Sequence, residues 1–459
     1  TVHRRPSMSN KDDAYWLRSG VISLAERVVS MGFNLGSAML LLRLLSKEAF
    51  AAWGIFVLLT YFVEMGRSGL LQNGLIRFLQ MPFDQPSDKA RLISAAFGLH
   101  LAYTLFSNLV LAVVAPWVAT QYQVPDFLPM LPVYYLTNLV WAGCTHSIYV
   151  QQAHFDFRGM LVTSIFYRGL PFLWVFVCWY TGSAIALWQW PAMQLLGAAI
   201  ALWWHRKVLF NRDILQGINY WQWYRTLLNF GKFVLGTNLS TMMYKNADKL
   251  ILGKLLGPAA FAVYDVAGRV TQLVEAPAFS IASVVFPKSA ERMALEGASG
   301  VRQLYEKSVG ATLAVILPFV LLVLLFPGLM VRFFAGTQYP ESAELLRITA
   351  FFGLFMPFAV QFGTALDAGG KPAVNFIFTL GTALLNLALC YWMVPIFGLK
   401  GAAFATLAGY MLSFLAMQTY LYYTFGVVAV RAFRYLPEFY KKLGSVIRRG
   451  GGTAKALRR

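Results

Sequence analysis

The chain has 459 residues, of which 58% are hydrophobic and 13% are charged, and its formal net charge is +19. Soluble domains are about half apolar and about a quarter charged, so this composition excludes an ordinary soluble protein and favours one whose outer surface faces lipid. The basic residues lie in short connections and at the C-terminal end, between long apolar runs. Membrane insertion produces this distribution, which argues against nucleic acid as a partner.

Long apolar runs follow one another along the whole chain. A helix needs about 20 apolar residues to cross the hydrocarbon core, and the runs are continuous rather than alternating with period two, which excludes a membrane barrel. The predicted spans are 20–42, 49–75, 92–118, 128–151, 160–181, 183–204, 228–250, 259–286, 308–331, 343–367, 373–395 and 399–424. The expected fold class is therefore an all-α integral membrane protein with about twelve transmembrane helices.

The positions of the basic residues between the spans predict the orientation. With the N-terminus in the cytoplasm, 26 Lys and Arg residues lie on the cytoplasmic side and five on the other side. This asymmetry is the positive-inside pattern, so both termini are expected in the cytoplasm. The external connections, such as 121–126 and 181–183, are short.

The second half of the sequence partly repeats the first half. Residues 44–64 and 255–275 match at eight of 21 positions with an offset of 211, and the matches include Glu64 with Glu275. The offset joins the second span to the eighth, which predicts two six-helix lobes of one orientation, a pattern typical of transporters. The expected regions are a cytoplasmic segment 1–19, an N-lobe 20–204, an interlobe connection 205–227, a C-lobe 228–424 and a basic cytoplasmic tail 425–459.

Several charged residues lie inside the predicted spans, where a charge is costly unless it faces a cavity or a partner. The cations are Arg27, Arg67, Arg168, Lys232, Lys245, Lys249 and Arg269. The acids are Glu26, Glu64, Asp248, Asp265 and Glu275. The excess of cations in the first, fifth, seventh and eighth spans points to an anionic substrate, and phosphate or pyrophosphate is the natural partner of Arg.

A structural explanation competes with this functional one. Glu64 with Arg67, and Asp265 with Arg269, have the spacing of ion pairs within one helix. Lys249, Arg347 and Asp367 lie near span ends, where their side chains are expected to reach the interface. Gly353 and Pro357 inside the tenth span predict either close helix packing or a bend.

The segment 246–287 resembles the polysaccharide-export branch of the MOP superfamily, which includes Wzx-type flippases of lipid-linked oligosaccharides. The residues that carry the resemblance are Asp248, the element Leu252–Gly257, Tyr264 and Pro287. The resemblance implies a V-shaped, MATE-like pair of lobes around a cationic cavity. It also implies transfer of a polyprenyl-pyrophosphate-linked oligosaccharide from the cytoplasmic to the outer leaflet of a bacterial inner membrane, for O-antigen or exopolysaccharide synthesis.

In this picture Arg27 and Arg269 hold the pyrophosphate, with Arg168, Lys232 and Lys245 as further candidates. Glu64 and Glu275 are the first candidates for coupling or gating, and the others are Glu26, Arg67, Asp248 and Asp265. A proton or sodium gradient is the expected energy source, because the chain has no P-loop. The partners expected are the lipid-linked oligosaccharide, membrane lipids and other polysaccharide-assembly proteins.

Two other functions stay open. A multidrug antiporter of the same superfamily would hold cations with acids and aromatic residues, whereas the deep charges here lean cationic. A membrane glycosyltransferase or polymerase needs acid–base groups, usually on a large external loop, and we find no such loop and no catalytic motif. The sequence therefore predicts a transporter rather than an enzyme, without a bound cofactor or metal, since the five histidines lack metal-ligand spacing.

Overall fold

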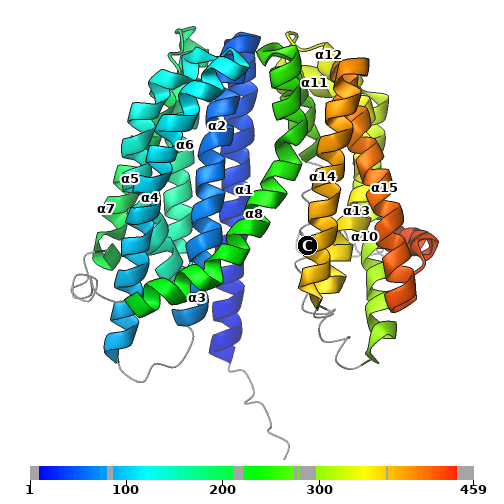
Figure 1. Cartoon of the computed structure of the whole chain (residues 1–459), viewed down its shortest axis with the longest axis horizontal. Helices are drawn as coiled ribbons and strands as arrows, with labels where there is room; N and C mark the ends of the chain where they lie inside the picture. Colours follow the sequence, from blue (N-terminus) through cyan, green and yellow to red (C-terminus); the bar gives the residue numbers. More distant parts are fainter. Residues whose placement is uncertain are drawn as a thin grey trace, which may run out of the picture. The chain divides into compact units, whose positions relative to one another are not determined.

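The computed structural model describes residues 10–79, 86–154, 156–209, 221–272, 278, 296–368 and 371–441, and within these ranges the chain forms helices and no strand. The chain divides into two compact units, Thr1–Met242 and Met243–Arg459. Each unit is an assembly of long helices (Figure 1).

The first unit is built from seven α-helices and part of an eighth among the residues described. They are α1 (Asn10–Leu44), α2 (Lys47–Arg67), α3 (Asn73–Leu79), α4 (Pro86–Tyr122), α5 (Leu131–Ala153), α6 (Arg158–Thr181), α7 (Gln189–Leu209) and the start of α8 (Trp221–Leu256). Helix α1 packs on α6, α4 packs on α5, and α7 packs on both α5 and α6.

The second predicted span is not one regular helix. Ser46 caps the start of α2 by accepting a hydrogen bond from the Ala49 amide at 3.2 Å, and α2 ends at Arg67. A π-helical turn, Ser68–Gln72, then joins α2 to α3. Single π-turns inside helices often mark functional sites. Here the turn directly follows the charged residues predicted on α2.

Helix α8 crosses the boundary between the two units without a break, since that boundary lies at Met242. Its first half packs tightly on the π-turn: a Cβ at Gly231 would lie 2.0 Å from the Leu70 carbonyl oxygen. The predicted interlobe connection 205–227 is partly helical, because α7 continues to Leu209 and α8 begins at Trp221.

The second unit contains the rest of α8, a helix over residues 258–272, and six further α-helices among the residues described. These are α10 (Ala298–Leu325), α11 (Pro327–Ala335), α12 (Glu341–Ala350), α13 (Phe352–Ala368), α14 (Pro372–Phe397) and α15 (Leu399–Phe425). The helix at 258 begins 211 residues after α2, and Phe50 and Phe261, which the repeat pairs, are both buried.

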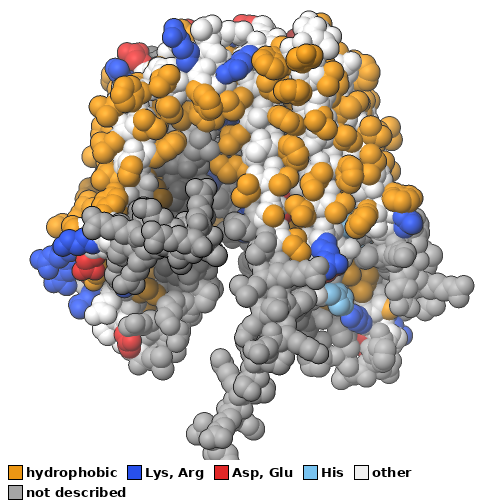
Figure 2. Space-filling view, turned by 180° about the vertical axis from the view of Figure 1, so that it is seen from behind, with side chains coloured by type: hydrophobic (Ala, Val, Ile, Leu, Met, Phe, Trp, Pro, Cys, Tyr) orange, Lys and Arg blue, Asp and Glu red, His pale blue; other side chains and the backbone are white. Residues whose placement is uncertain are grey.

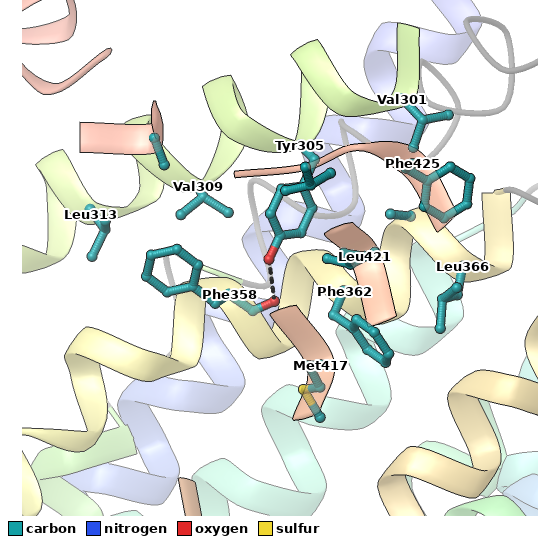
Figure 3. Close-up of a cluster of buried hydrophobic side chains, with 13 residues drawn as sticks. Val301, Tyr305, Val309, Leu313, Phe358, Phe362, Leu366, Met417, Leu421 and Phe425 are labelled. Carbon is teal, nitrogen blue, oxygen red and sulfur yellow. Dashed lines mark hydrogen bonds between the residues drawn. The ribbon is translucent and has the colours of Figure 1, made fainter. Parts of the chain in front are cut away.

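The core of the second unit lies where α10, α13 and α15 meet. Figure 3 shows Tyr305 of α10 pointing toward α13, where its hydroxyl donates to the Phe358 carbonyl oxygen at 3.3 Å. Phe362, Met417 and Leu421 are further members of this buried cluster. Because its members come from helices far apart in sequence, the cluster fixes how these helices pack.

The residues after α15 fold back onto α10 instead of leaving the helices at once. Gly426 ends α15 in the left-handed conformation, and a short 3-10 helix, Ala429–Arg434, follows. Its Ala432 is buried, and the Tyr440 hydroxyl donates to the Ala314 carbonyl oxygen at 2.7 Å. The first part of the predicted basic tail is therefore packed on the second unit.

Within the described residues every predicted span is mostly helical, although residues 183–188 of the sixth span precede α7 and Phe326 interrupts the ninth span. Six of the described helical segments are long and apolar enough to cross a membrane. The pair α12 and α13, bent by 45° at Phe351, adds a seventh if the two helices form one span. Helix α13 continues through Gly353 and Pro357, so the bend lies just before the residues at which a bend was one of the two predictions. The chain is thus an integral membrane protein, and the total of twelve spans stays a prediction. Figure 2 shows hydrophobic side chains covering the outside of the helices, with charged ones nearer their ends.

Candidate functional site

In the first unit, Arg67 is the centre of a buried polar cluster. Its side chain is completely buried, and its Nη1 lies 3.1 Å from Glu64 Oε2 one turn earlier on α2. Its Nη2 donates to Thr104 Oγ1 of α4 at 3.2 Å and to Asn138 Oδ1 of α5. Side chains of three helices therefore bind the two terminal nitrogens of this guanidinium, which offsets part of the cost of burying the cation.

Aromatic residues enclose the acidic end of this cluster. The Trp141 indole of α5 donates to Glu64 Oε2 at 2.9 Å, and the Trp141 ring stacks on Tyr167 of α6 at 3.9 Å between centroids. The Glu64 side chain keeps 31% of its surface exposed, whereas that of Arg67 keeps none. Glu64 is thus the end of the cluster that solvent or a ligand can reach.

Glu26 forms a separate site with α6. Its Oε1 accepts hydrogen bonds from Ser30 Oγ, on the same helix, and from Ser164 Oγ of α6, both at 2.6 Å. Two hydroxyl donors stabilise a carboxylate in a half-buried position. The next residue, Arg27, is exposed on α1.

In the second unit, one carboxylate binds two cations. Asp265 is buried, with Lys249 Nζ of α8 at 2.5 Å from Oδ1 and Arg269 Nε at 2.7 Å from Oδ2. These three side chains carry one excess positive charge if all are ionised.

Asp248 lies beside Lys249 on α8 in a different arrangement. Its Oδ2 accepts hydrogen bonds from the Tyr264 hydroxyl at 2.7 Å and from Thr406 Oγ1 of α15 at 3.0 Å. Thr406 Oγ1 also lies 3.3 Å from Asn386 Oδ1 of α14. A buried carboxylate among neutral oxygen groups suits a residue that gains or loses a cation.

The structure brings together some of the predicted site residues. Both predicted pairs within a helix are confirmed as ion pairs, Glu64 with Arg67 and Asp265 with Arg269. Arg168 is half-buried on α6, and Lys232 and Lys245 are exposed on α8, where Lys232 donates to Asn229 Oδ1 at 3.2 Å. Arg27 and Arg269 belong to different units. Glu275 lies outside the described residues.

The prediction that Lys249 reaches the interface is wrong. Lys249 is 8% exposed, and its ammonium group pairs with Asp265. An opposite charge sixteen residues later stabilises the buried ammonium better than a distant interface does. Arg347, for which the same behaviour was predicted, is exposed.

Sequence reasoning also missed the neutral partners. Thr104, Asn138 and Trp141 complete the cluster around Arg67, and Tyr264 and Thr406 bind Asp248. The signal that could have found Asn138 is its position in an otherwise apolar span, because buried amides need partners. Tyr264 was noted for the resemblance without a structural role.

The family comparison matches the part of the chain that contains the Arg67 cluster and the Asp265 cluster. A family model described as "Polysaccharide biosynthesis protein" matches residues 40–344. Among curated relatives, a probable low-salt glycan biosynthesis flippase of Haloferax volcanii is 23% identical over 197 residues, which is 43% of this chain and 42% of that protein. A candidate O-antigen transporter of Shigella flexneri is 20% identical over 410 residues, 85% of this chain and 92% of that protein. The first curated relatives are matched over about two fifths of their length, 40% and 42%.

Two solved structures show which fold this is. An inward-facing multidrug resistance MATE family transporter of the MOP superfamily matches with a TM-score of 0.76 and 14% identity, over 90% of this chain and 96% of that one. The lipid II flippase MurJ, in an inward closed conformation, matches with a TM-score of 0.72 and 14% identity, over 92% of this chain and 90% of that one. The fold is common to drug transporters and lipid flippases, so fold alone does not choose between them.

Proposed function

Because the chain belongs to the polysaccharide biosynthesis protein family, whose model matches residues 40–344, we propose that it is a flippase for a polyprenyl-pyrophosphate-linked oligosaccharide. That match is the observation that carries the proposal. It confirms the resemblance to the polysaccharide-export branch of the MOP superfamily. The Haloferax relative is named as a glycan flippase and the Shigella relative as an O-antigen transporter, which supports the same activity here.

The charges of the second unit support an anionic headgroup. Lys249 and Arg269 both pair with Asp265, and we propose that these two cations attract a pyrophosphate. Guanidinium binds phosphate oxygens through two parallel donors. The first candidates for binding the pyrophosphate are Arg269 in the second unit and the exposed Arg27 in the first unit. Arg168, Lys232 and Lys245 are further candidates.

The proposed direction is from the cytoplasmic to the outer leaflet of the cytoplasmic membrane, with both termini in the cytoplasm. The excess of basic residues in the connections on that side supports this orientation. Partners are then the lipid-linked oligosaccharide, the surrounding lipids and the membrane proteins that make and polymerise the oligosaccharide.

Alternating access driven by a proton or sodium gradient is the proposed energy coupling. Glu64 and Asp248 are the described carboxylates best placed for it, because the first is partly exposed next to Arg67 and the second is buried among neutral oxygen groups. Glu26, Arg67, Asp265 and Glu275 are the other candidates. Neutralising the coupling carboxylate should remove the effect of the gradient.

A leaflet assay in proteoliposomes tests the proposed function. Transport of a labelled polyprenyl-pyrophosphate oligosaccharide and transport of a cationic dye are measured in parallel, with and without an imposed ion gradient. Movement of the lipid-linked oligosaccharide alone is the expected result. Movement of the dye alone would make the protein a multidrug antiporter, and chemical change of the oligosaccharide would make it an enzyme.

A further inference from the structure

Two histidines lie inside the first unit and have no role in the function proposed above. His100 of α4 and His146 of α5 are both completely buried. Their rings meet edge to face, with 5.3 Å between the centroids. Phe97 and Tyr149 cover the pair, at 5.1 Å from His146 and 5.4 Å from His100.

The four ring nitrogens of this pair lack hydrogen-bond partners within the described part of the chain. A neutral imidazole carries one donor and one acceptor, and each such group left unsatisfied in a protein interior destabilises the folded state. Apolar side chains of similar size would fill the same space without this cost. We therefore expect the ring nitrogens of these two residues to bind an ion or a proton in another state of the protein.

The surroundings favour a proton over a metal ion or an anion. Groups of three or more metal-binding side chains are absent from the described residues, and the neighbours of the pair are aromatic rings and one cation. Imidazole is the side chain whose charge changes near neutral pH, and histidines inside membrane spans commonly relay protons. The first protonated ring would oppose a second, so the pair would hold one proton.

Arg67 connects this pair with the cluster on α2. Its Nη2 donates to Thr104 Oγ1, and that hydroxyl donates to the His100 carbonyl oxygen at 2.7 Å. Arg67 Nε has no partner among the described residues. Titratable groups on the helices packed around the pair include Glu64 (α2), Arg77 (α3), Asp88, Lys89, Arg91, Tyr103 and Tyr122 (α4), Tyr134, Tyr135, Cys144 and Tyr149 (α5), Tyr167 and Arg168 (α6), His205 and Arg206 (α7), Asp126 in the turn before α5, and Tyr224 of α8, whose hydroxyl would lie 2.6 Å from a Cβ at Gly98.

We propose that His100 and His146 form a binding site for one proton, and that the proton bound there acts on Arg67 by charge repulsion. This inference rests on the proposed flippase function, because it identifies the coupling ion. A neutral imidazole that takes a proton from water becomes a cation with two N–H donors, close to an existing guanidinium. An anion that offsets the charge of Arg67 would therefore make the proton bind more readily.

The test uses the full-length protein in proteoliposomes with lumenal pyranine as the proton probe and labelled polyprenyl-pyrophosphate oligosaccharide as the substrate. Wild type, His100→Gln, His146→Gln and the double variant are compared with and without a pH gradient. His154→Gln is the matched control, because His154 is an exposed residue at the end of the same helix α5. Thermal unfolding in detergent checks that each variant is folded.

The expected result is that a pH gradient speeds substrate movement in wild type and in His154→Gln, and that this acceleration falls at least tenfold in each His100 or His146 variant. Movement without a gradient should stay within twofold of wild type. Wild-type acceleration in either single variant would overturn the proton site, even if the double variant fails to fold. Wild-type substrate movement with no proton flux and no response to pH would also overturn it and leave the flippase function standing. A wild type that moves no substrate would refute both proposals.

Discussion

The Arg67 guanidinium lies 3.1 Å from the Glu64 carboxylate, although one side chain is completely buried and the other keeps 31% of its surface exposed. The pair is therefore asymmetric. Solvent can compensate Glu64 if its partner is lost, whereas Arg67 depends on Glu64, Thr104 and Asn138. Removing either member should thus have different consequences.

Replacing Glu64 by Gln should destabilise the protein more than its exposure suggests, because Arg67 would remain as a buried cation without its counter-charge. Breaking a buried pair costs about 3–5 kcal/mol in the free energy of unfolding. Lys400→Ala is the control, since its pair with Glu344 is exposed on both sides, at 48% and 64%. Exposed pairs contribute about 0–1 kcal/mol. Denaturant unfolding in detergent measures the free energy of unfolding of both variants. Equal decreases in the two variants would contradict the asymmetry of the Glu64–Arg67 pair.

Changing Arg269 to Ala should abolish movement of the lipid-linked oligosaccharide while the protein still inserts normally, and Arg27→Ala should do the same. Lys at either position should rescue partly, because an ammonium group lacks the two parallel donors of guanidinium. The proteoliposome assay measures the rates, with Lys400→Ala as the control. Full activity of both Ala variants would remove these residues from the substrate site.

Two glycines of α8 should respond in opposite ways to replacement by Ala. At Gly231 a Cβ would lie 2.0 Å from the Leu70 carbonyl oxygen, so α8 must move away from the π-turn. At Gly236 no atom lies within 4 Å of the added Cβ. There Ala should stabilise the helix by up to about 1 kcal/mol. Thermal unfolding compares the two, and a Gly231→Ala protein as stable as Gly236→Ala would refute the close contact.

His205, near the C-terminal end of α7, should make stability depend on pH. Burial lowers the pKa of His205 from 6.5 to about 4, against a smaller opposite effect of Asp156. Between pH 4 and 6.5 the unfolded chain binds a proton that the folded chain does not, so stability falls as pH falls through this window and is complete above 6.5.

The melting temperature of wild type, minus that of His205→Gln, should therefore decrease from pH 6.5 to pH 4 and stay constant above that window. The Thr163 hydroxyl, 2.8 Å from His205 Nε2, and the Gln151 amide nitrogen, 3.3 Å from His205 Nδ1, bind the neutral ring in this arrangement. A difference that does not change with pH would show that His205 is not a buried neutral residue.

Apolar length and the spacing of charges were enough to predict the helices and the two ion pairs within a helix. The details that depend on packing were not accessible. The π-turn after Arg67 and the break before Pro327 leave no trace in hydropathy, because the flanking residues are equally apolar on both sides. Lys249 looked like a residue near a span end, since the pairing with Asp265 arises only when two helices pack.

The histidine pair illustrates the same limit. Nothing in the spacing of His100 and His146, 46 residues apart, relates one to the other. Their juxtaposition follows from the antiparallel packing of α4 on α5, which brings the two rings to 5.3 Å. A residue type that is rare in apolar spans was the available signal, and it pointed to single residues rather than to a site.

The π-turn Ser68–Gln72 amounts to a one-residue insertion in what would otherwise be one continuous α-helix. Deleting one of its residues would restore regular backbone bonding and turn everything after it by about 100°. Leu75 and Leu79, now buried against α4 and α5, would then leave that core, while Glu64 and Arg67 would stay where they are. Relatives that keep this extra residue should keep both the charged pair before the turn and the buried leucines after it. Relatives that lack it should have different residues at one of these two sets of positions.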